Sequence, residues 1–242
     1  MFLGEIFCLA VYKVIKAVKK EDSAIKVPVS VFRFAVPALF DVLGSSLCLV
    51  GLTMCAGSIY QMLRASLIVM TATLAYLFLG RKQFFHHFVG LILILSALTI
   101  VIFTGILNKS EDSEIIETKP LGIIVVILGQ LCIALKLVAQ ENLVQGQDVD
   151  PLIQVGIEGV WGLIIYVTIV FPIVTNMTCD PDSHICTETG YREDLQQAFT
   201  EYRETPRLLF LSCCLIFSVS GYNATATSMV KYASAAQAVT VG

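Results

Sequence analysis

Long runs of apolar residues, about twenty residues each, constrain this chain more than any other feature of its sequence. The runs carry almost no charge, whereas the segments between them hold most of the Lys, Arg, Asp and Glu. Representative runs are Phe34 to Cys55, Ser58 to Leu79, Phe88 to Leu107, Leu121 to Gln140, Leu152 to Thr175 and Leu208 to Ala226. In lipid, backbone N–H and C=O groups must bond within their own segment, so each run is expected to be a membrane-spanning helix. The sequence therefore predicts an all-α integral membrane protein, a multi-helix bundle.

Composition excludes several other classes. Hydrophobic residues make up 56% of the chain and charged residues 14%, against roughly 25% charged residues in soluble domains. The net charge of −3 argues against nucleic acid as a partner, because phosphate binding needs a concentrated basic surface. No nucleophile with an adjacent base and no phosphate-binding glycine loop is found, so an enzyme is disfavoured and no cofactor is expected. The pair His86-His87 lacks a third ligand, and we predict no metal site.

We expect seven spanning segments and the start of an eighth. The N-terminus is not a signal peptide, because it lacks a positive n-region and carries Glu5 inside its apolar stretch. Residues 231–242 are typical of a loop followed by the first turns of another helix. The sequence is therefore expected to be a fragment or alternative product, truncated at both ends. The segments are 1–18, 34–55, 58–79, 86–107, 120–140, 152–175 and 207–226, with the eighth beginning near Ser234.

The charges of the connecting segments predict an orientation. The links at 19–33 and 81–82 are basic and should face the cytosol, which places loops 108–119 and 176–206 on the lumenal side. On that side lie two glycosylation patterns, at Asn108 and Asn176, and two cysteines, Cys179 and Cys186, that are candidates for a short disulfide. Within loop 176–206, Leu195, Phe199 and Tyr202 recur at spacings of three and four. This spacing predicts a short amphipathic helix, and a solvated loop is the alternative.

Four ionisable residues fall inside the apolar runs: Asp41, Arg64, Lys136 and Glu158. Such residues are expensive in a bilayer and by default face the bundle interior, where they pair or line a substrate path. Lys136 and Glu158 lie at matching depth on consecutive antiparallel helices, which predicts an ion pair. The alternative is that Lys136 extends to the membrane interface. Asp41 is a further candidate for a structural or gating ion pair, although its depth does not match that of Arg64.

Polar residues near these charges are candidates for substrate binding. Gln61 shares a helix face with Arg64, and together they predict a clamp for an anionic solute. The alternative is that Arg64 bonds backbone carbonyls or reaches the interface. Gln130 and Asn223 either line a cavity or hold helices together, a use worth about 0.6 to 2 kcal/mol. Glycines at 156, 159 and 162 predict the close approach of another backbone.

The chain also contains a weak internal repeat. Residues 56–61 (AGSIYQ) resemble residues 232–237 (YASAAQ), each a tight turn followed by a helix with Gln at the same offset. The two copies leave opposite sides of the membrane in the predicted topology. Such an arrangement is expected of an inverted repeat.

Four short motifs are informative when taken together. They are Met1 to Glu5 with Cys8-Leu9, Tyr60 to Arg64, Phe78 to Lys82 followed by Val89-Gly90, and Gly156 to Gly162. These motifs resemble the drug/metabolite transporter superfamily. Within it, the chain is similar to the nucleotide-sugar-transporter-like solute carrier 35 family, in its F branch, close to member six. The resemblance covers nearly the whole chain.

This resemblance implies ten helices in two inverted five-helix halves around a central cavity. Residues 1–107 would then hold helices 2–5 of the first half, and residues 120–242 helices 6–8 and the start of helix 9. It implies an endomembrane location, Golgi or lysosomal. The family pattern predicts a basic residue near Ala238, where this chain has none.

Two functions follow. The first is a carrier that moves a small polar, anionic metabolite by alternating access, with membrane lipid as its environment and no nucleic acid as partner. The alternative is a non-transporting regulatory or scaffolding membrane protein, arising by truncation, that binds partner helices or a second copy. A seven-helix receptor fits the segment count but not the two-residue link at Ala56-Gly57.

Overall fold

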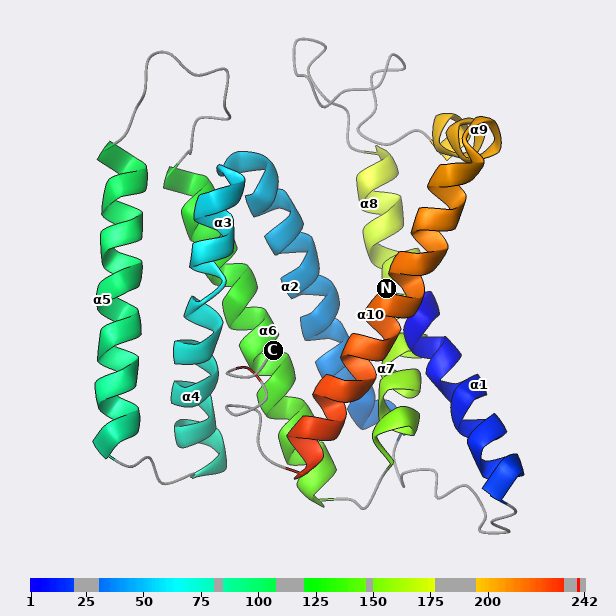
Figure 1. Cartoon of the computed structure of the whole chain (residues 1–242), viewed down its shortest axis with the longest axis horizontal. Coiled ribbons are helices and arrows are strands. Elements are labelled where there is room, and N and C mark those ends of the chain that lie inside the picture. The colour runs from blue at the N-terminus through cyan, green and yellow to red at the C-terminus, as the bar shows by residue number, and fades with distance from the viewer. Residues whose placement is uncertain are drawn as a thin grey trace. The chain divides into compact units, whose positions relative to one another are not determined.

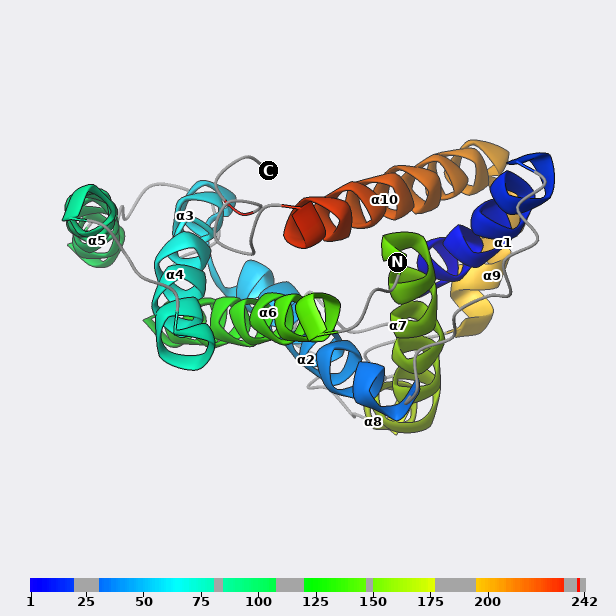
Figure 2. The same ribbon diagram turned by 90° about the horizontal axis from the view of Figure 1, so that it is seen from below.

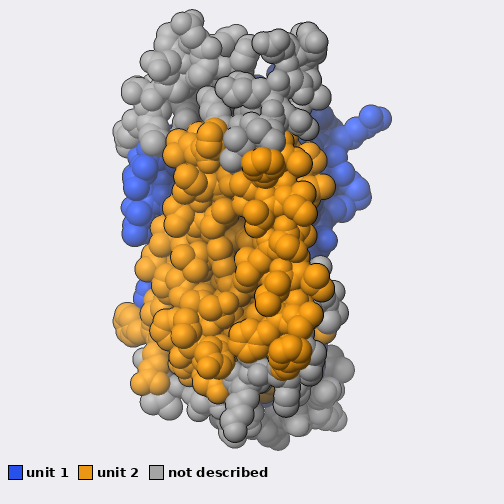
Figure 3. All heavy atoms as spheres, turned by 90° about the vertical axis from the view of Figure 1, so that its left-hand side faces the viewer, with its two compact units in different colours: residues 1–24, 152–225 blue, residues 25–151, 226–242 orange. Residues whose placement is uncertain are grey.

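The computed structural model of the chain describes residues 1–19, 31–80, 85–107, 120–146, 150–176, 195–232 and 239. Within these ranges the chain is helical and contains no strand. It divides into two compact units (Figure 1; coloured separately in Figure 3). Unit 1 comprises residues 1–24 and 152–225, and unit 2 comprises residues 25–151 and 226–242. The predicted all-α class is confirmed.

Six helical stretches in the described residues are long and apolar enough to cross a membrane. The first predicted segment, residues 1–18, forms helix α1 (Phe2–Lys19) but is not among the six. Its 18 residues include Glu5 and three lysines, so it is less apolar than the others. The six are Val31–Met54, Gly57–Leu79, His87–Thr104, Pro120–Leu143, Pro151–Thr175 and Pro206–Lys231.

In unit 1, one spanning stretch changes its helical pitch near a proline. Helix α7 (Pro151–Ile165) continues into the π-helix η2 (Tyr166–Val170) and then into α8 (Phe171–Asn176). The Phe171 N–H donates to the Tyr166 carbonyl, five residues earlier. Pro172 has no N–H to donate, so the regular ladder cannot continue unchanged at this point. A π-turn next to a proline is a known way to accommodate such a gap.

Helix α1 packs against α7 through the glycines that predicted a close backbone approach. A Cβ added at Gly159 would lie 2.6 Å from the Glu5 Cβ and 3.0 Å from the Ile6 nitrogen. Gly156 faces Leu9 and Gly162 faces the Phe2 ring in the same way. The prediction is confirmed, and the approaching backbone is that of α1.

The long helix α10 (Pro206–Tyr232) contacts the opposite side of α1; its residues from Ala226 onward belong to unit 2. A Cβ at Gly4 would meet the Ile216 carbonyl oxygen at 2.6 Å, and the rings of Phe7 and Phe217 pack edge to face. Figure 2 shows α1 and α10 side by side. Helix α1 is therefore held between α7 and α10 by close helix contacts on both sides.

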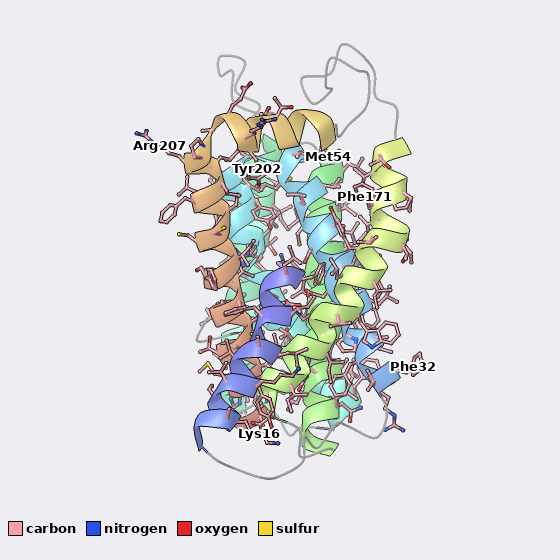
Figure 4. The ribbon with its side chains drawn as sticks, turned by 90° about the vertical axis from the view of Figure 1, so that its right-hand side faces the viewer. Lys16, Phe32, Met54, Phe171, Tyr202 and Arg207 are labelled. Atoms are coloured by element: carbon pink, nitrogen blue, oxygen red, sulfur yellow. The ribbon has the colours of Figure 1, made fainter. Side chains whose placement is uncertain are left out.

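The amphipathic helix predicted in the long polar loop is present as α9 (Leu195–Glu204). It lies across the end of α10, as Figure 4 shows around the labelled Tyr202. The Tyr202 and Ser212 hydroxyl groups are 3.0 Å apart and join the two helices. The bend between them is closed by the Leu208 N–H, which donates to the Thr205 carbonyl.

Unit 2 is built around one helix crossing. It contains η1 (Val31–Phe34), α2 (Ala35–Met54), α3 (Gly57–Leu63), α4 (Ser66–Leu79), α5 (Phe85–Leu107) and α6 (Pro120–Gly146). Helices α2 and α6 make the most extensive contact, along two rows of residues with the same four-three-four spacing. Small residues in these rows let the backbones approach closely, as in other membrane helix pairs. The rows are Gly44, Cys48 and Gly51 on α2 with Cys55 directly after its end, and Gly122, Val126, Gly129 and Ile133 on α6.

Helix α4 also packs on α6, and α5 lies beyond α4 at one edge of the unit (Figures 1 and 2). Large apolar side chains of α5, such as Leu93 and Phe103, are more than 60% exposed. Helix α5 lies at the left-hand side of Figure 1, which is the side that Figure 3 presents. Such an exposed apolar surface is suited to lipid.

Two predicted helix ends are wrong. The segment predicted at 120–140 extends to Gly146, and the segment predicted at 207–226 extends to Tyr232. Gln140 and Glu141 are buried, so packing carries α6 past the end of its apolar run. Asn108, Cys179, Cys186 and residues 233–237 of the repeat lie outside the described residues, as does the side chain of Asn176.

Candidate functional site

The segment predicted as one span at 58–79 is broken in the middle. Helix α3 ends at Leu63 and α4 begins at Ser66, with Arg64 and Ala65 between them. Here the Ala65 N–H donates to the Met62 carbonyl and the Leu67 N–H donates to the Arg64 carbonyl, both at 3.1 Å. Each of these bonds joins residues that are three apart, whereas the bonds of a regular α-helix join residues that are four apart. Interrupted helices at membrane depth occur where the backbone is buried in protein or lines a cavity.

Arg64 lies at this break, and its side chain is exposed. Within the part of the chain that the structure describes, its guanidinium has no hydrogen-bond or ion-pair partner. Gln61, three residues earlier on α3, is also exposed. An ionisable group inside a membrane span without a partner is a functional-site candidate by default.

A buried polar group from each of α2 and α6 lies next to this break. The Gln130 amide Nε2 donates to the Cys48 Sγ at 3.4 Å. The Tyr60 hydroxyl lies beside the same thiol, and the Arg64 guanidinium is close enough to interact electrostatically with both. Gln130 is only 1% exposed, and its Oε1 has no partner. The structure thus brings Gln130 and Arg64, two of the predicted site residues, into one neighbourhood.

Farther along the same crossing lies an ion pair. Lys136 Nζ and Asp41 Oδ1 are 2.9 Å apart, and both side chains are nearly buried. Lys136 follows Gln130 by six residues, and Asp41 precedes Cys48 by seven. At 1.5 Å per residue, the ion pair lies about 9 to 10 Å from the Cys48–Gln130 contact. The predicted pair of Lys136 with Glu158 joins residues of different units and stays a prediction.

Unit 1 places its predicted site residues in bonds between or within helices. Asn223 of α10 donates through Nδ2 to the Glu5 carboxylate of α1. The Glu158 carboxylate accepts from Gln154 Nε2 at 3.1 Å within α7. The Ser220 hydroxyl donates to the Gly4 carbonyl at 2.6 Å and lies 3.1 Å from the Cys8 Sγ. These bonds connect α1 to α10, and the role predicted for Asn223 in solute binding stays a prediction.

Sequence reasoning missed several of these residues. Cys48 and Tyr60 were assigned no role, although Cys48 falls in the row of small residues that marks the crossing of α2 and α6. Glu5 entered as an argument against a signal peptide and as part of a motif, without a role in the bundle, yet it is 2% exposed. Gln154 lies four residues before Glu158, and that spacing alone was a signal for the bond they form.

Among the residues that the structure describes, no three His, Cys, Asp or Glu side chains gather as metal ligands. The polar groups near the break at Arg64 are instead amide, hydroxyl, thiol and guanidinium groups. These groups bind by hydrogen bonds and charge.

Bilayer-length helices define a multi-pass membrane protein, and one of them is interrupted at an arginine that has no hydrogen-bond or ion-pair partner among the described residues. The chain belongs to the CRT-like, chloroquine-resistance transporter-like family, whose model matches residues 2–202. The predicted resemblance to the drug/metabolite transporters is thereby confirmed.

Individual relatives agree with this assignment. The chain is 30% identical over 239 residues to solute carrier family 35 member F6 of Rattus norvegicus, and 29% identical to the Homo sapiens protein of that name. These alignments cover 97% of this chain but 63% and 64% of the relatives. An uncharacterized protein of Schizosaccharomyces pombe is 31% identical over 83% of this chain and 59% of its own length. The chain thus spans less than two thirds of the relatives it matches.

Proposed function

We propose that the chain is a solute carrier, or part of one, that moves a small polar anion across a membrane by alternating access. The observation that carries this proposal is Arg64. It has a guanidinium without a partner among the described residues, at a break in a bilayer-length helix. A structural arginine at that depth would be expected to have a carboxylate partner, as Lys136 has in Asp41.

The chemistry of the neighbours fits an anion. Arg64 offers a planar fork of N–H donors that matches a carboxylate or phosphate in two parallel bonds. Low dielectric around the helices strengthens that attraction relative to water. Gln61 adds an amide one turn earlier, and Tyr60 adds a hydroxyl close to the Cys48 thiol. Nucleotide-sugar-like solutes carry phosphates and hydroxyl groups and belong to this class.

The rest of the proposal concerns the whole protein. The rat and human relatives are named as solute carriers, and discontinuous helices next to polar residues suit a fold with inverted halves. We propose the endomembrane system, Golgi or lysosome, as the location. In this account residues 1–107 and 120–242 belong to the two halves.

Counterflow in proteoliposomes tests the proposal. The panel contains nucleotide sugars, nucleotides and vitamin-like anions, and it is run on this chain and on a form extended to the length of the relatives. We expect the extended form to exchange at least one anion and to prefer anions over neutral sugars of the same size.

Uptake by the extended form alone would assign transport to the longer protein. Uptake of neutral solutes at the same rate would contradict the anion part of the proposal. Absence of uptake in both forms would favour a non-transporting regulatory or scaffolding role.

A further inference from the structure

Three polar atoms of unit 2 are buried without a hydrogen-bond partner in the part of the chain that the structure describes. They are the Ser66 Oγ, the Thr71 Oγ1 and the Gln130 Oε1. The three residues are 7%, 0% and 1% exposed. Buried polar groups in folded proteins nearly always find a partner, so each exception calls for a physical explanation.

The three atoms come from two helices that pack on each other. Ser66 and Thr71 lie on α4, and Gln130 lies on α6. Both helices run in the same direction from the end of the unit at which α3 and α6 begin (Figure 1). Leu63 belongs to one buried cluster with Ile123 and Val126 of α6. This cluster places Leu63, just before α4, beside the first two turns of α6.

Measured from this cluster, Ser66 and Gln130 lie at similar depths. Ser66 follows Leu63 by three residues, and Gln130 follows Val126 by four and Ile123 by seven, so at 1.5 Å per residue their heights differ by about 1.5 to 6 Å. Thr71 lies farther along, about 3 to 7.5 Å from the height of Lys136 by the same measure. A series of polar groups therefore runs along unit 2 from Arg64, past Ser66 and Gln130, to Thr71 and the ion pair of Lys136.

The hydrogen-bonding chemistry of these three unpartnered oxygens limits which ligand could bind them. A hydroxyl both donates and accepts, and an amide oxygen only accepts. A ligand that satisfies all three must therefore carry its own N–H or O–H donors. A simple anion bound at Arg64 lacks such donors.

We propose that Ser66, Thr71 and Gln130 form the hydrogen-bonding part of the solute site, so that the solute is an anion bearing several hydroxyl or amide groups. The anionic group binds Arg64, and the hydroxyl or amide groups bind Ser66 and Gln130 in the conformation that admits the solute. This inference rests on the proposed function and adds to it the second chemical feature of the solute.

We call Ser66, Thr71 and Gln130 the hydrogen-bonding strip. Cysteine labelling tests whether water and anions reach this strip. Ser66→Cys exchanges one oxygen for sulfur, and Leu77→Cys places the control thiol on the same helix at a position that is 66% exposed on the apolar surface. The cysteine thiolate, which forms only in contact with water, attacks the sulfenyl sulfur of a methanethiosulfonate reagent, so that a mixed disulfide forms and methanesulfinate leaves. An anionic and a cationic reagent are applied separately to the protein in proteoliposomes. The labelling rate of each reagent is divided by the rate at which that reagent labels a free thiol. Mass spectrometry identifies the labelled peptide.

We expect Ser66→Cys to react at least about tenfold faster than Leu77→Cys, because only the first thiol meets water and can ionise. The anionic reagent should be favoured, and Arg64→Gln should remove that preference. Glycerol 3-phosphate should slow the labelling more than propyl phosphate, which has the same anion and chain length without the hydroxyl groups. A melting curve of each variant controls for folding.

The outcomes separate the two proposals. Labelling of Ser66→Cys as slow as that of Leu77→Cys would overturn the inference. Equal protection by the two phosphates, including none, would overturn it as well, while a charge preference that depends on Arg64 would leave the proposed function standing. Fast labelling and unequal protection without any charge preference would support the hydrogen-bonding strip and contradict the anion clamp.

Discussion

The two units differ in how many buried polar side-chain atoms lack a hydrogen-bond partner among the described residues: one in unit 1, the Gln154 Oε1, and three in unit 2. In unit 1 the polar side chains of α1 are bonded to α10, as in the Asn223–Glu5 pair and the bonds of Ser220 to Gly4 and Cys8. In unit 2 the ion pair of Asp41 with Lys136 is accompanied by the unpartnered groups of Arg64, Ser66, Thr71 and Gln130. The comparison indicates that polar residues in unit 1 mainly hold helices together, whereas part of the polar set in unit 2 is left available for a ligand.

The largest effect on stability should come from breaking the Asp41–Lys136 ion pair at the crossing of α2 and α6. Asp41→Asn removes the carboxylate that pairs with the nearly buried Lys136 ammonium, and breaking a buried pair in this way costs about 3 to 5 kcal/mol. Replacing both residues, with Asp41→Leu and Lys136→Met, should recover most of that loss. Unfolding of the purified variants in mixed micelles measures the difference. If the double variant is as unstable as Asp41→Asn, loss of the ion pair does not explain the destabilisation.

Single and double substitutions also test Glu158, the partner that matching membrane depth predicted for Lys136. If Lys136 also pairs with Glu158, charge reversal at either residue should lower expression, and the double reversal should restore it. Equal damage from the single and the double reversals would refute that pair and leave Asp41 as the partner.

Packing against α1 should give the next largest effect. Gly159→Val forces a branched side chain into the space of Glu5 and the Ile6 backbone, and such overpacking costs typically about 1 to 3 kcal/mol. Gly221→Ala is the matched control on α10, because nothing lies within 4 Å of the added Cβ. Melting temperatures of the two variants measure the contrast. If Gly159→Val melts like the control, the close contact of α1 and α7 is wrong.

The smallest expected stability changes come from replacing one amide side chain in each unit, and they test the difference between the units. Asn223→Leu removes an interhelical bond in unit 1 and should destabilise by about 0.6 to 2 kcal/mol. Gln130→Leu in unit 2 removes an amide whose oxygen has no partner, so its stability should be unchanged or increased. Both replacements put an apolar side chain of similar size in place of an amide. Unfolding curves of the two variants measure the difference in stability. A larger loss for Gln130→Leu would contradict the division between the units.

Most of the helices could be predicted from the sequence, because hydropathy is a local property and each span needs about twenty apolar residues. The break at Arg64 and Ala65 could not, since the residues around it remain apolar and only the backbone bonds change. The continuation of α6 past Gln140 depends on tertiary burial of Glu141, which no local pattern records.

The site was predicted in part. Arg64 and Gln130 stood out because polar groups are rare in apolar runs. Their neighbours on α2 did not, because Cys48 looks like an ordinary small residue. The bond of Lys136 to Asp41 was missed because the depth argument considered helices consecutive in sequence, whereas α2 packs on α6 across a long separation. Likewise, glycines at 156, 159 and 162 predicted a close helix without showing that it is α1.

One measurement tests most directly whether the unpartnered groups of unit 2 are functional. It records the melting temperature and anion counterflow of Arg64→Gln in the extended form, beside those of the unchanged protein and of Arg64→Lys. We predict lost counterflow for Arg64→Gln, a partial loss for Arg64→Lys, and unfolding free energies within about 0.5 kcal/mol of the unchanged protein, as for sites without structural partners. Unchanged counterflow, or a fall in stability as large as that of Asp41→Asn, would contradict the account.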